Sequence, residues 1–261
     1  MEWLDRLNAM EGDIGFYARR LSEESAIEVN ADLPLIAASV IKIPIMVSAY
    51  RAAREGTLVL DETIAVRREN KMPSCGALTY MRDGLSVSWE DLVTLMIILS
   101  DNTATNLLID RLTIPYVNET MEMLGISGVT LRRKLFDAEQ SQQGIENTLT
   151  ARSVAELLSR ICSGSLLGGK WDAHMLETLS NQRLNGKIPF FLHSRGIRVA
   201  HKTGEDDGIT HDCGIVFARE PFVLCMLGNR TSVPAYERLM QDTALALCED
   251  RGWTRNEKDQ I

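Results

Sequence analysis

Strand-like patterns occur at both ends of this chain, and helical patterns fill the stretch between them. After a polar, helical opening segment, residues 14–21 and 26–30 alternate like two strands joined by a turn. Beyond residue 195, short apolar runs are separated by Gly, Asp and Pro, which is typical of antiparallel strands. The sequence therefore predicts an α+β fold, with an antiparallel sheet of about five strands built from both termini, flanked by helices, and an inserted all-helical lobe. The later strands and the last helix are predicted over residues 197–201, 213–217, 222–227 and 235–250.

Helices are predicted for most of the middle of the chain. Residues 39–56 carry apolar side chains at helical spacing, and residues 88–99 predict a buried helix with Ser88 as its N-cap and Asp91 completing a capping box. Residues 58–84 are rich in charge and turn residues, which predicts an extended excursion with little regular structure. Further helices are predicted from Thr103 onward and over residues 117–124 and 153–161.

We expect a single unit over residues 1–261, because 45% of the residues are hydrophobic and can bury a large core. The sheet lobe would comprise about residues 1–34 and 195–261, and the helical lobe about residues 35–194. The residues around positions 39 and 100 would then lie at the seam between the lobes, where clefts usually form.

Charge and hydropathy exclude two classes of partner. The formal net charge is −8 with a pI near 5.1, whereas nucleic-acid-binding proteins normally carry a basic excess. No apolar run approaches the length of a membrane-spanning helix. The opening residues lack the basic and apolar regions of a signal peptide, so we expect a cytoplasmic location as written, and a periplasmic or secreted one if a signal was trimmed.

The cysteines indicate no metal site. They form an odd, scattered set without Cys-x-x-Cys or Cys/His clustering, which favours free thiols of a reducing compartment that mostly fill the core. Cys75 precedes the Ser100 helix and is a candidate for the mouth of a cleft, although a buried thiol is the expectation. We expect no cofactor. The five cysteines are Cys75, Cys162, Cys213, Cys225 and Cys248.

Ser39 and Lys42 form a possible nucleophile and base at a helix start. Side chains at i and i+3 project from the same helix face, so Lys42 can reach Ser39 within one turn. A serine needs such a partner because its hydroxyl is a weak nucleophile at its free pKa. The spacing alone also fits a helix-capping serine beside a solvated lysine.

Two later motifs change the interpretation of this pair. The tripeptides Ser100-Asp101-Asn102 and Lys202-Thr203-Gly204 follow Ser39-Val40-Ile41-Lys42 in the order found in class A β-lactamases and penicillin-binding proteins. The chain resembles the class A β-lactamase family from about Ile14 to Leu247, including Ser100 to Asn106 and Asp212.

The resemblance implies a role for each motif residue. Ser39 would be the acylated nucleophile, Lys42 its base, and Ser100 a relay of the proton to the leaving nitrogen. Lys202 would hold the Ser100 hydroxyl and attract the substrate carboxylate. Asn102 would hold the acyl-amide side chain. Thr203 and Gly204 would line the substrate site, with Thr203 bonding the carboxylate, and the backbone N–H groups of Ser39 and Glu205 would form the oxyanion hole. Asp101 is expected to brace its turn, and His201 to face away from Lys202.

The loop over residues 131–147 departs from the family pattern. The family's Glu-x-x-x-Asn is absent, and an ungapped count places Phe136 where the glutamate should be. Asp137 and Glu139 remain candidates for the deacylation base. Asp137 is alternatively a structural carboxylate paired with Arg132 or Arg133.

The family's carboxylate-assisting arginine is also missing after Lys202-Thr203-Gly204, where Gly208 to His211 stand. Arg195 and Arg198 are alternatives.

The leading hypothesis is a serine hydrolase that opens the β-lactam amide through an acyl-serine intermediate. The alternatives are a cytoplasmic serine peptidase, amidase or esterase of the same fold, and a slowly deacylating penicillin-binding protein. The expected partner is a small β-lactam or related amide or ester, with neither nucleic acid nor membrane.

Overall fold

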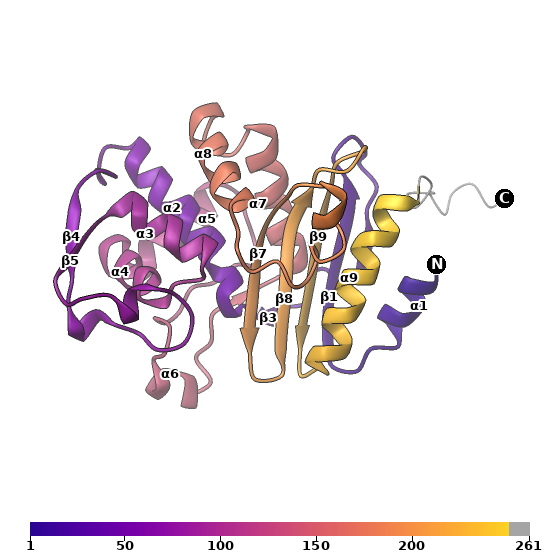
Figure 1. The fold of residues 1–261 in the computed structure, drawn as a ribbon, viewed down its shortest axis with the longest axis horizontal. Coiled ribbons are helices and arrows are strands. Elements are labelled where there is room, and N and C mark those ends of the chain that lie inside the picture. Colours follow the sequence, from indigo (N-terminus) through magenta and orange to yellow (C-terminus); the bar gives the residue numbers. More distant parts are fainter. Residues whose placement is uncertain (251–261) are drawn as a thin grey trace.

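The computed structural model describes residues 1–250, and its centre is one antiparallel sheet (Figure 1). The strand order is β2-β1-β9-β8-β7, so the first and last parts of the chain meet where β1 pairs with β9. This confirms the predicted α+β fold and the origin of the sheet in both termini. The strands are β1 (Asp13–Arg20), β2 (Ile27–Val29), β7 (Val199–Asp206), β8 (Ile209–Val216) and β9 (Phe222–Asn229).

The two terminal helices cover one face of the sheet. In Figure 1, α1 (Glu2–Asn8) and α9 (Val233–Glu249) lie together on the side away from the other helices. Trp3, Phe16 and Leu239 belong to the apolar core beneath them. Because α1 and α9 are buried against this face of the sheet, the other helices pack against the opposite face.

The inserted segment is mainly helical and adds two short strand pairs. β3 (Leu35–Ile36) pairs with β6 (Thr148–Leu149), and β4 (Thr63–Val66) pairs with β5 (Leu85–Ser88). Short 3₁₀ turns are η1 (Ala38–Ile41), η2 (Arg68–Asn70), η3 (Leu78–Tyr80) and η4 (His193–Arg195). The α-helices are α2 (Lys42–Arg54), α3 (Trp89–Ile98), α4 (Asn102–Leu112), α5 (Ile114–Met123), α6 (Ala138–Gln142), α7 (Ala151–Ser163) and α8 (Gly169–Ser180).

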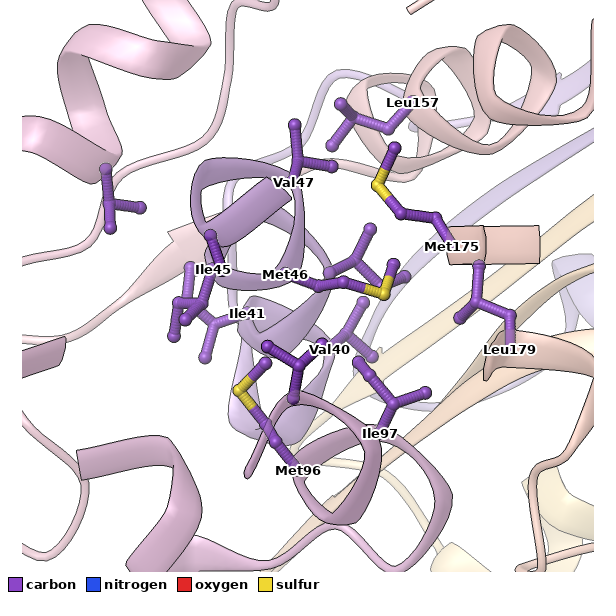
Figure 2. Packing of buried hydrophobic residues seen from close by; sticks show 14 of the residues in the cluster. Val40, Ile41, Ile45, Met46, Val47, Met96, Ile97, Leu157, Met175 and Leu179 are labelled. Atoms are coloured by element: carbon purple, nitrogen blue, oxygen red, sulfur yellow. The ribbon is translucent and has the colours of Figure 1, made fainter. Parts of the chain in front are cut away.

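The η1 turn and α2 pass through the centre of the larger core. Figure 2 shows Val40 and Met46 surrounded by side chains of α3, α7 and α8. Both side chains are completely buried, and each apolar side chain of this size contributes about 1.5–3 kcal/mol when removed from water. The turn that carries Ser39 is therefore held by packing on several sides. The surrounding residues labelled in Figure 2 are Met96, Ile97, Leu157, Met175 and Leu179.

Some element predictions need correction. The helix predicted over 39–56 begins as the 3₁₀ turn η1 and becomes α-helical only at Lys42. The segment 58–84, predicted to have little regular structure, contains strand β4 and two 3₁₀ turns. The sequence pattern did not reveal β4, because its partner β5 follows only about twenty residues later, beyond the reach of a local pattern. The strands of the last third are longer than predicted. The predicted lobe boundaries stay a prediction, and residues 251–261 lie outside the described part.

No helix in residues 1–250 combines the length and the apolar character that crossing a bilayer requires.

Candidate active site

Ser39 lies in the 3₁₀ turn η1, and Lys42 caps this turn and is the first residue of α2. The Lys42 N–H donates to the Ser39 carbonyl oxygen, and side chains at i and i+3 of a 3₁₀ helix eclipse. The two side chains therefore leave the turn on the same side. Ala38 has a φ of 42°, in the left-handed region that residues other than glycine rarely occupy. Strain of this kind costs about 1–3 kcal/mol and is maintained by surrounding packing, which the buried η1 and α2 supply.

The Ser100 turn connects α3 to α4 and is braced by Asp101. The Asp101 carboxylate accepts hydrogen bonds from the backbone N–H groups of Ala77 (2.7 Å) and Leu78 (2.8 Å), and it also caps α4. The predicted bracing role of Asp101 is confirmed. Ser100 has a φ of 54°, so a second strained residue stands at the site.

Lys42 is buried and hydrogen-bonds across to the Ser100 turn rather than to Ser39. Its Nζ lies 2.7 Å from the Ser100 carbonyl oxygen, 3.0 Å from Ser100 Oγ and 2.8 Å from Asn102 Oδ1. Asn102 Nδ2 donates to the Pro73 carbonyl oxygen, which fixes the amide with Oδ1 toward the lysine. Burial, and then the charge of Lys202, hold the pKa of Lys42 well below its usual value.

These three contacts determine where the lone pair of a neutral Lys42 points. Two of the partners are carbonyl oxygens, which can only accept hydrogen bonds. A neutral amine therefore uses both N–H groups on the Ser100 and Asn102 carbonyl oxygens and directs its lone pair to the Ser100 hydroxyl. The Ser100 hydroxyl then donates its proton to Lys42 in this contact.

Lys202 approaches the same hydroxyl from β7. Its Nζ donates to Ser100 Oγ (3.0 Å) and to the Thr203 carbonyl oxygen (2.8 Å). Burial lowers the pKa of Lys202 to about 7, and Lys187 lowers it further against the opposing effect of Asp212. Ser100 Oγ thus lies between two buried amines, as the motif pattern predicted.

Gly204 allows β7 to pack directly on the nucleophile turn. A Cβ at this position would lie 3.2 Å from Val40 Cγ2 and 3.3 Å from Ala38 Cβ, so a larger residue would displace the strand. β7 is the edge of the sheet on the side of η1 (Figure 1). This close approach brings Glu205 beside the Ser39 turn, where the two backbone N–H groups remain the predicted oxyanion hole.

A cleft of about 540 Å³ opens over these elements. Ser39, Asn102, Glu205 and Asp137 line it, together with residues of the loop 131–147. The structure therefore brings most of the predicted site to one surface. The buried side chains behind it are Lys42, Ser100 and Lys202.

Of the two candidate bases of the loop, Asp137 lines the cleft and Glu139 does not. Asp137 caps α6 and accepts a hydrogen bond from the Gln140 N–H at 3.1 Å. Glu139 lies exposed on α6. The backbone of Leu135 is held by Asn106, which donates from Nδ2 to the Leu135 carbonyl and accepts its N–H, both at 2.9 Å.

The proposed pairing of Asp137 with Arg132 or Arg133 is wrong. Arg133 instead forms an ion pair with Glu146, whose other oxygen accepts a hydrogen bond from Ser141 Oγ at 2.6 Å. The ion pair between Arg133 and Glu146 joins the two ends of the loop 131–147. Because both oxygens of Glu146 already have partners, this carboxylate is also engaged by the protein.

A buried lysine behind β7 was missed by the sequence analysis. Lys187 Nζ lies 3.1 Å from the Gly204 carbonyl oxygen and 3.2 Å from that of His211, and it pairs with Glu205 (3.1 Å) and Glu237 (3.4 Å). No motif surrounds Lys187, so the sequence held no signal for it. Lys187 thus places a positive charge beside Gly204, where it is paired with two carboxylates and does not line the cleft.

Neither alternative arginine serves this purpose. Arg195 forms an ion pair with Glu249 at 2.6 Å, on the side of the terminal helix. The guanidinium of Arg198 stacks over the Phe217 ring at 3.7 Å. Both interactions hold the arginine side chains on other surfaces.

His201 is a buried structural residue, as expected. Its Nδ1 lies 2.8 Å from Asp212 Oδ1 and its Nε2 3.0 Å from Asn185 Oδ1, whereas Lys202 faces Ser100. The alternation of the strand places the two side chains on opposite faces.

The expectation of a buried Cys75 is wrong. This cysteine is exposed and lines the cleft, because its carbonyl oxygen is held by the Asn102 N–H and its side chain is left on the outside. Cys213 and Cys225 are buried core residues. No group of His, Cys, Asp or Glu in residues 1–250 is arranged to hold a metal ion.

Comparisons with known proteins agree with this geometry. The β-lactamase from Sphaerobacter thermophilus is 30% identical, with a TM-score of 0.87 over 95% of this chain and 94% of that one. The penicillin-binding protein PBP-A is 26% identical, with a TM-score of 0.85 over 95% and 93%. A β-lactamase from Chitinophaga pinensis, 17% identical, shares the fold with a TM-score of 0.85 over 95% and 97%. No curated protein matches the chain.

The model of the beta-lactamase enzyme family matches residues 2–249. This span contains the three motifs and the complete sheet. The chain therefore belongs to the beta-lactamase enzyme family.

Proposed function

We propose that the chain is an acyl-serine enzyme that opens β-lactams, and related amides or esters, at Ser39 and releases the acyl group slowly. The observation that carries this proposal is the position of Ser100 Oγ, 3.0 Å from both Lys42 Nζ and Lys202 Nζ. This cluster lies directly behind a cleft lined by Ser39.

Acylation follows from these contacts. Ser39 Oγ attacks the carbonyl carbon, and Lys42 in its neutral form turns its lone pair from the Ser100 hydroxyl to the Ser39 hydroxyl and takes that proton. The lowered pKa of Lys42 favours this neutral form. The amide C–N bond breaks, and the leaving nitrogen takes a proton from Ser100, which Lys42 replaces. Lys202, with its positive charge, holds Ser100 Oγ and attracts the substrate carboxylate. The backbone N–H groups of Ser39 and Glu205 stabilise the oxyanion.

Slow release is supported by the loop 131–147. Hydrolysis of the ester needs a base for water, and such assistance contributes about 10²–10⁴-fold. Asp137 caps α6, and Glu146 is bound by Arg133 and Ser141. A structure of a PBP-A variant, 25% identical to this chain with a TM-score of 0.83, is an acyl-enzyme complex with penicillin G.

Efficient β-lactam hydrolysis is the second candidate. It is favoured by the position of Asp137 on the cleft, where one carboxylate oxygen is not used by the Gln140 N–H. The two candidates share acylation and differ only in the rate at which Ser39 is regenerated.

The test is incubation with a chromogenic cephalosporin, followed by absorbance and intact mass. We expect a burst of one equivalent and a persistent adduct mapped to Ser39, with Ser39→Ala giving neither. Continued fast turnover without an adduct would establish the hydrolytic candidate. An adduct on another residue would refute the acyl-Ser39 scheme. The absence of adduct, burst and turnover together would also refute it.

A further inference from the structure

We propose that Phe136 is a specificity-determining residue whose exposed ring receives the apolar side chain of the acyl group bound at Ser39. This inference rests on the proposed acylation of Ser39. It concerns which acyl donors the cleft prefers, and it assigns Phe136 no part in the bond-breaking step.

Phe136 combines an exposed ring with an unfavourable backbone. The residue is 52% exposed and has a φ of 61°. A bulky residue with a left-handed φ is a genuine outlier, and such strain persists only where surrounding structure imposes it. An exposed phenyl ring buries little apolar surface, so its burial does little to offset the cost of this backbone strain. Folding alone therefore gives no reason for phenylalanine here.

The loop is fixed on both sides of Phe136. Asn106 holds the N–H and the carbonyl oxygen of Leu135, and Asp137 caps α6 through the Gln140 N–H. The strained residue lies between these two anchors. Its ring is thus presented from a defined backbone position.

The position of the ring joins it to the cleft. Phe136 lines the cleft that contains Ser39 and Asn102, and it also lines an adjoining pocket of about 240 Å³. Leu135 lines both spaces, and Met72 lines the second. Because Phe136 and Leu135 line the same cleft as Ser39 and Asn102, an acyl side chain held at Asn102 has apolar surface on the wall of that cleft. Aromatic rings are well suited to this contact because they offer a large, rigid apolar surface.

The charges around the ring favour a neutral substituent. Lys134 and Asp110 form an ion pair at 2.8 Å beside the second pocket, so their charges compensate each other. Glu69 and Asp137 add negative charge to its lining. The preferred acyl side chain is therefore aromatic or aliphatic and carries no negative charge.

Penicillin G and the acetamido penicillin that lacks its phenyl ring provide the test, because they differ only in that ring. The second-order rate constant of Ser39 acylation is measured for each by intact mass. We expect the wild-type protein to prefer penicillin G, and Phe136→Ala to reduce this preference about fivefold, the value of one aromatic contact.

Two further variants separate recognition from loop structure. Phe136→Asn keeps a residue that tolerates a left-handed φ and removes the ring, so it should lose the preference with no loss of thermal stability. Phe190→Ala is the matched control, because Phe190 is 50% exposed and packs on Phe191 at 4.9 Å, away from the cleft lining. It should leave the preference unchanged.

The outcomes distinguish the two proposals. If the wild-type protein neither forms an adduct at Ser39 nor turns over either penicillin, the proposed function fails and this inference fails with it. If adducts form but the preference is the same in the Ala and Asn variants as in the wild type, the inference alone is refuted. An equal slowing with both penicillins would also refute it, because the ring would then only shape the loop.

Discussion

The two walls of the cleft are built in different ways. Lys42, Ser100 and Lys202 are held on a core helix, a braced turn and a central sheet, and their side chains are buried. The opposite wall, the loop 131–147, contains only the short helix α6 and is held mainly by hydrogen bonds from side chains to its backbone. Rigid elements position side chains more accurately than loops do, so the cluster of Lys42, Ser100 and Lys202 is preorganised and the loop wall is not.

The largest effect on acylation is expected for Lys42→Met, which removes an amine from the rigid wall of the cleft. We expect acylation to fall about 10³-fold, the typical contribution of a general base. The free energy of unfolding at pH 7 should stay the same or rise. Burial holds the pKa of Lys42 in the folded state well below its usual value, so at pH 7, where the unfolded chain protonates this lysine, the group opposes folding. Burst kinetics and urea titration measure the two effects, and a retained burst would contradict the assignment.

The next effect concerns the charge of Lys202. With a pKa of about 7, Lys202 is half protonated at pH 7 and about 1% protonated at pH 9, so the acylation rate constant at low substrate should fall about 50-fold between these pH values. Lys202→Arg should flatten this alkaline limb, because arginine keeps its charge. A profile that is flat to pH 9 in the wild type would show that the charge of Lys202 is not needed.

The free energy of unfolding should also depend on the protonation of Lys202. Between pH 7 and pH 10 the unfolded state binds more protons than the folded state, so the Lys202 contribution makes the protein more stable as the pH rises. The slope should be absent in Lys202→Met. Chemical denaturation at several pH values measures it, and equal slopes in both proteins would contradict the lowered pKa.

A smaller effect is expected where β7 meets the nucleophile turn. In Gly204→Ala the new Cβ would lie 3.0 Å from His211 Cδ2, and it would also crowd Val40 and Ala38. We expect a destabilisation of about 1–3 kcal/mol, typical of overpacking, with slower acylation. Gly186→Ala is a suitable control, because its Cβ would meet open space. Equal stability of the two variants would argue against a tight contact.

The smallest effect is expected in the loop, from Asp137→Asn. Asparagine caps a helix as well as aspartate does, so α6 should remain formed. Acylation and deacylation should both change less than about twofold, in contrast to the 10²–10⁴-fold loss expected of a general base. The decay of the acyl adduct by mass measures this. A selective loss of deacylation would make Asp137 the base and remove the difference between the two walls.

The difference between the walls also explains what the sequence predicts. The sheet and the capped helices follow from periodicity, and Ser39, Ser100 and Lys202 follow from short motifs at fixed positions in these elements. The loop has no period, and its contacts depend on partners such as Asn106 that lie about thirty residues away. Lys187 is placed by the tertiary fold alone, and Cys75 is turned outward by a backbone contact. Neither residue stands in a pattern that sequence can reveal.

The pairing of β1 with β9 has a consequence for how the protein matures. It joins residues 13–20 to residues 222–229, so more than two hundred residues must be made before the sheet can close. Contacts of such long sequence separation form slowly, because a large loop must be ordered first. Lys202 reaches Ser100 only through this sheet. A growing chain on the ribosome therefore carries Ser39 and Lys42 before the contact between Lys202 and Ser100 can form, and that contact requires residues 222–229.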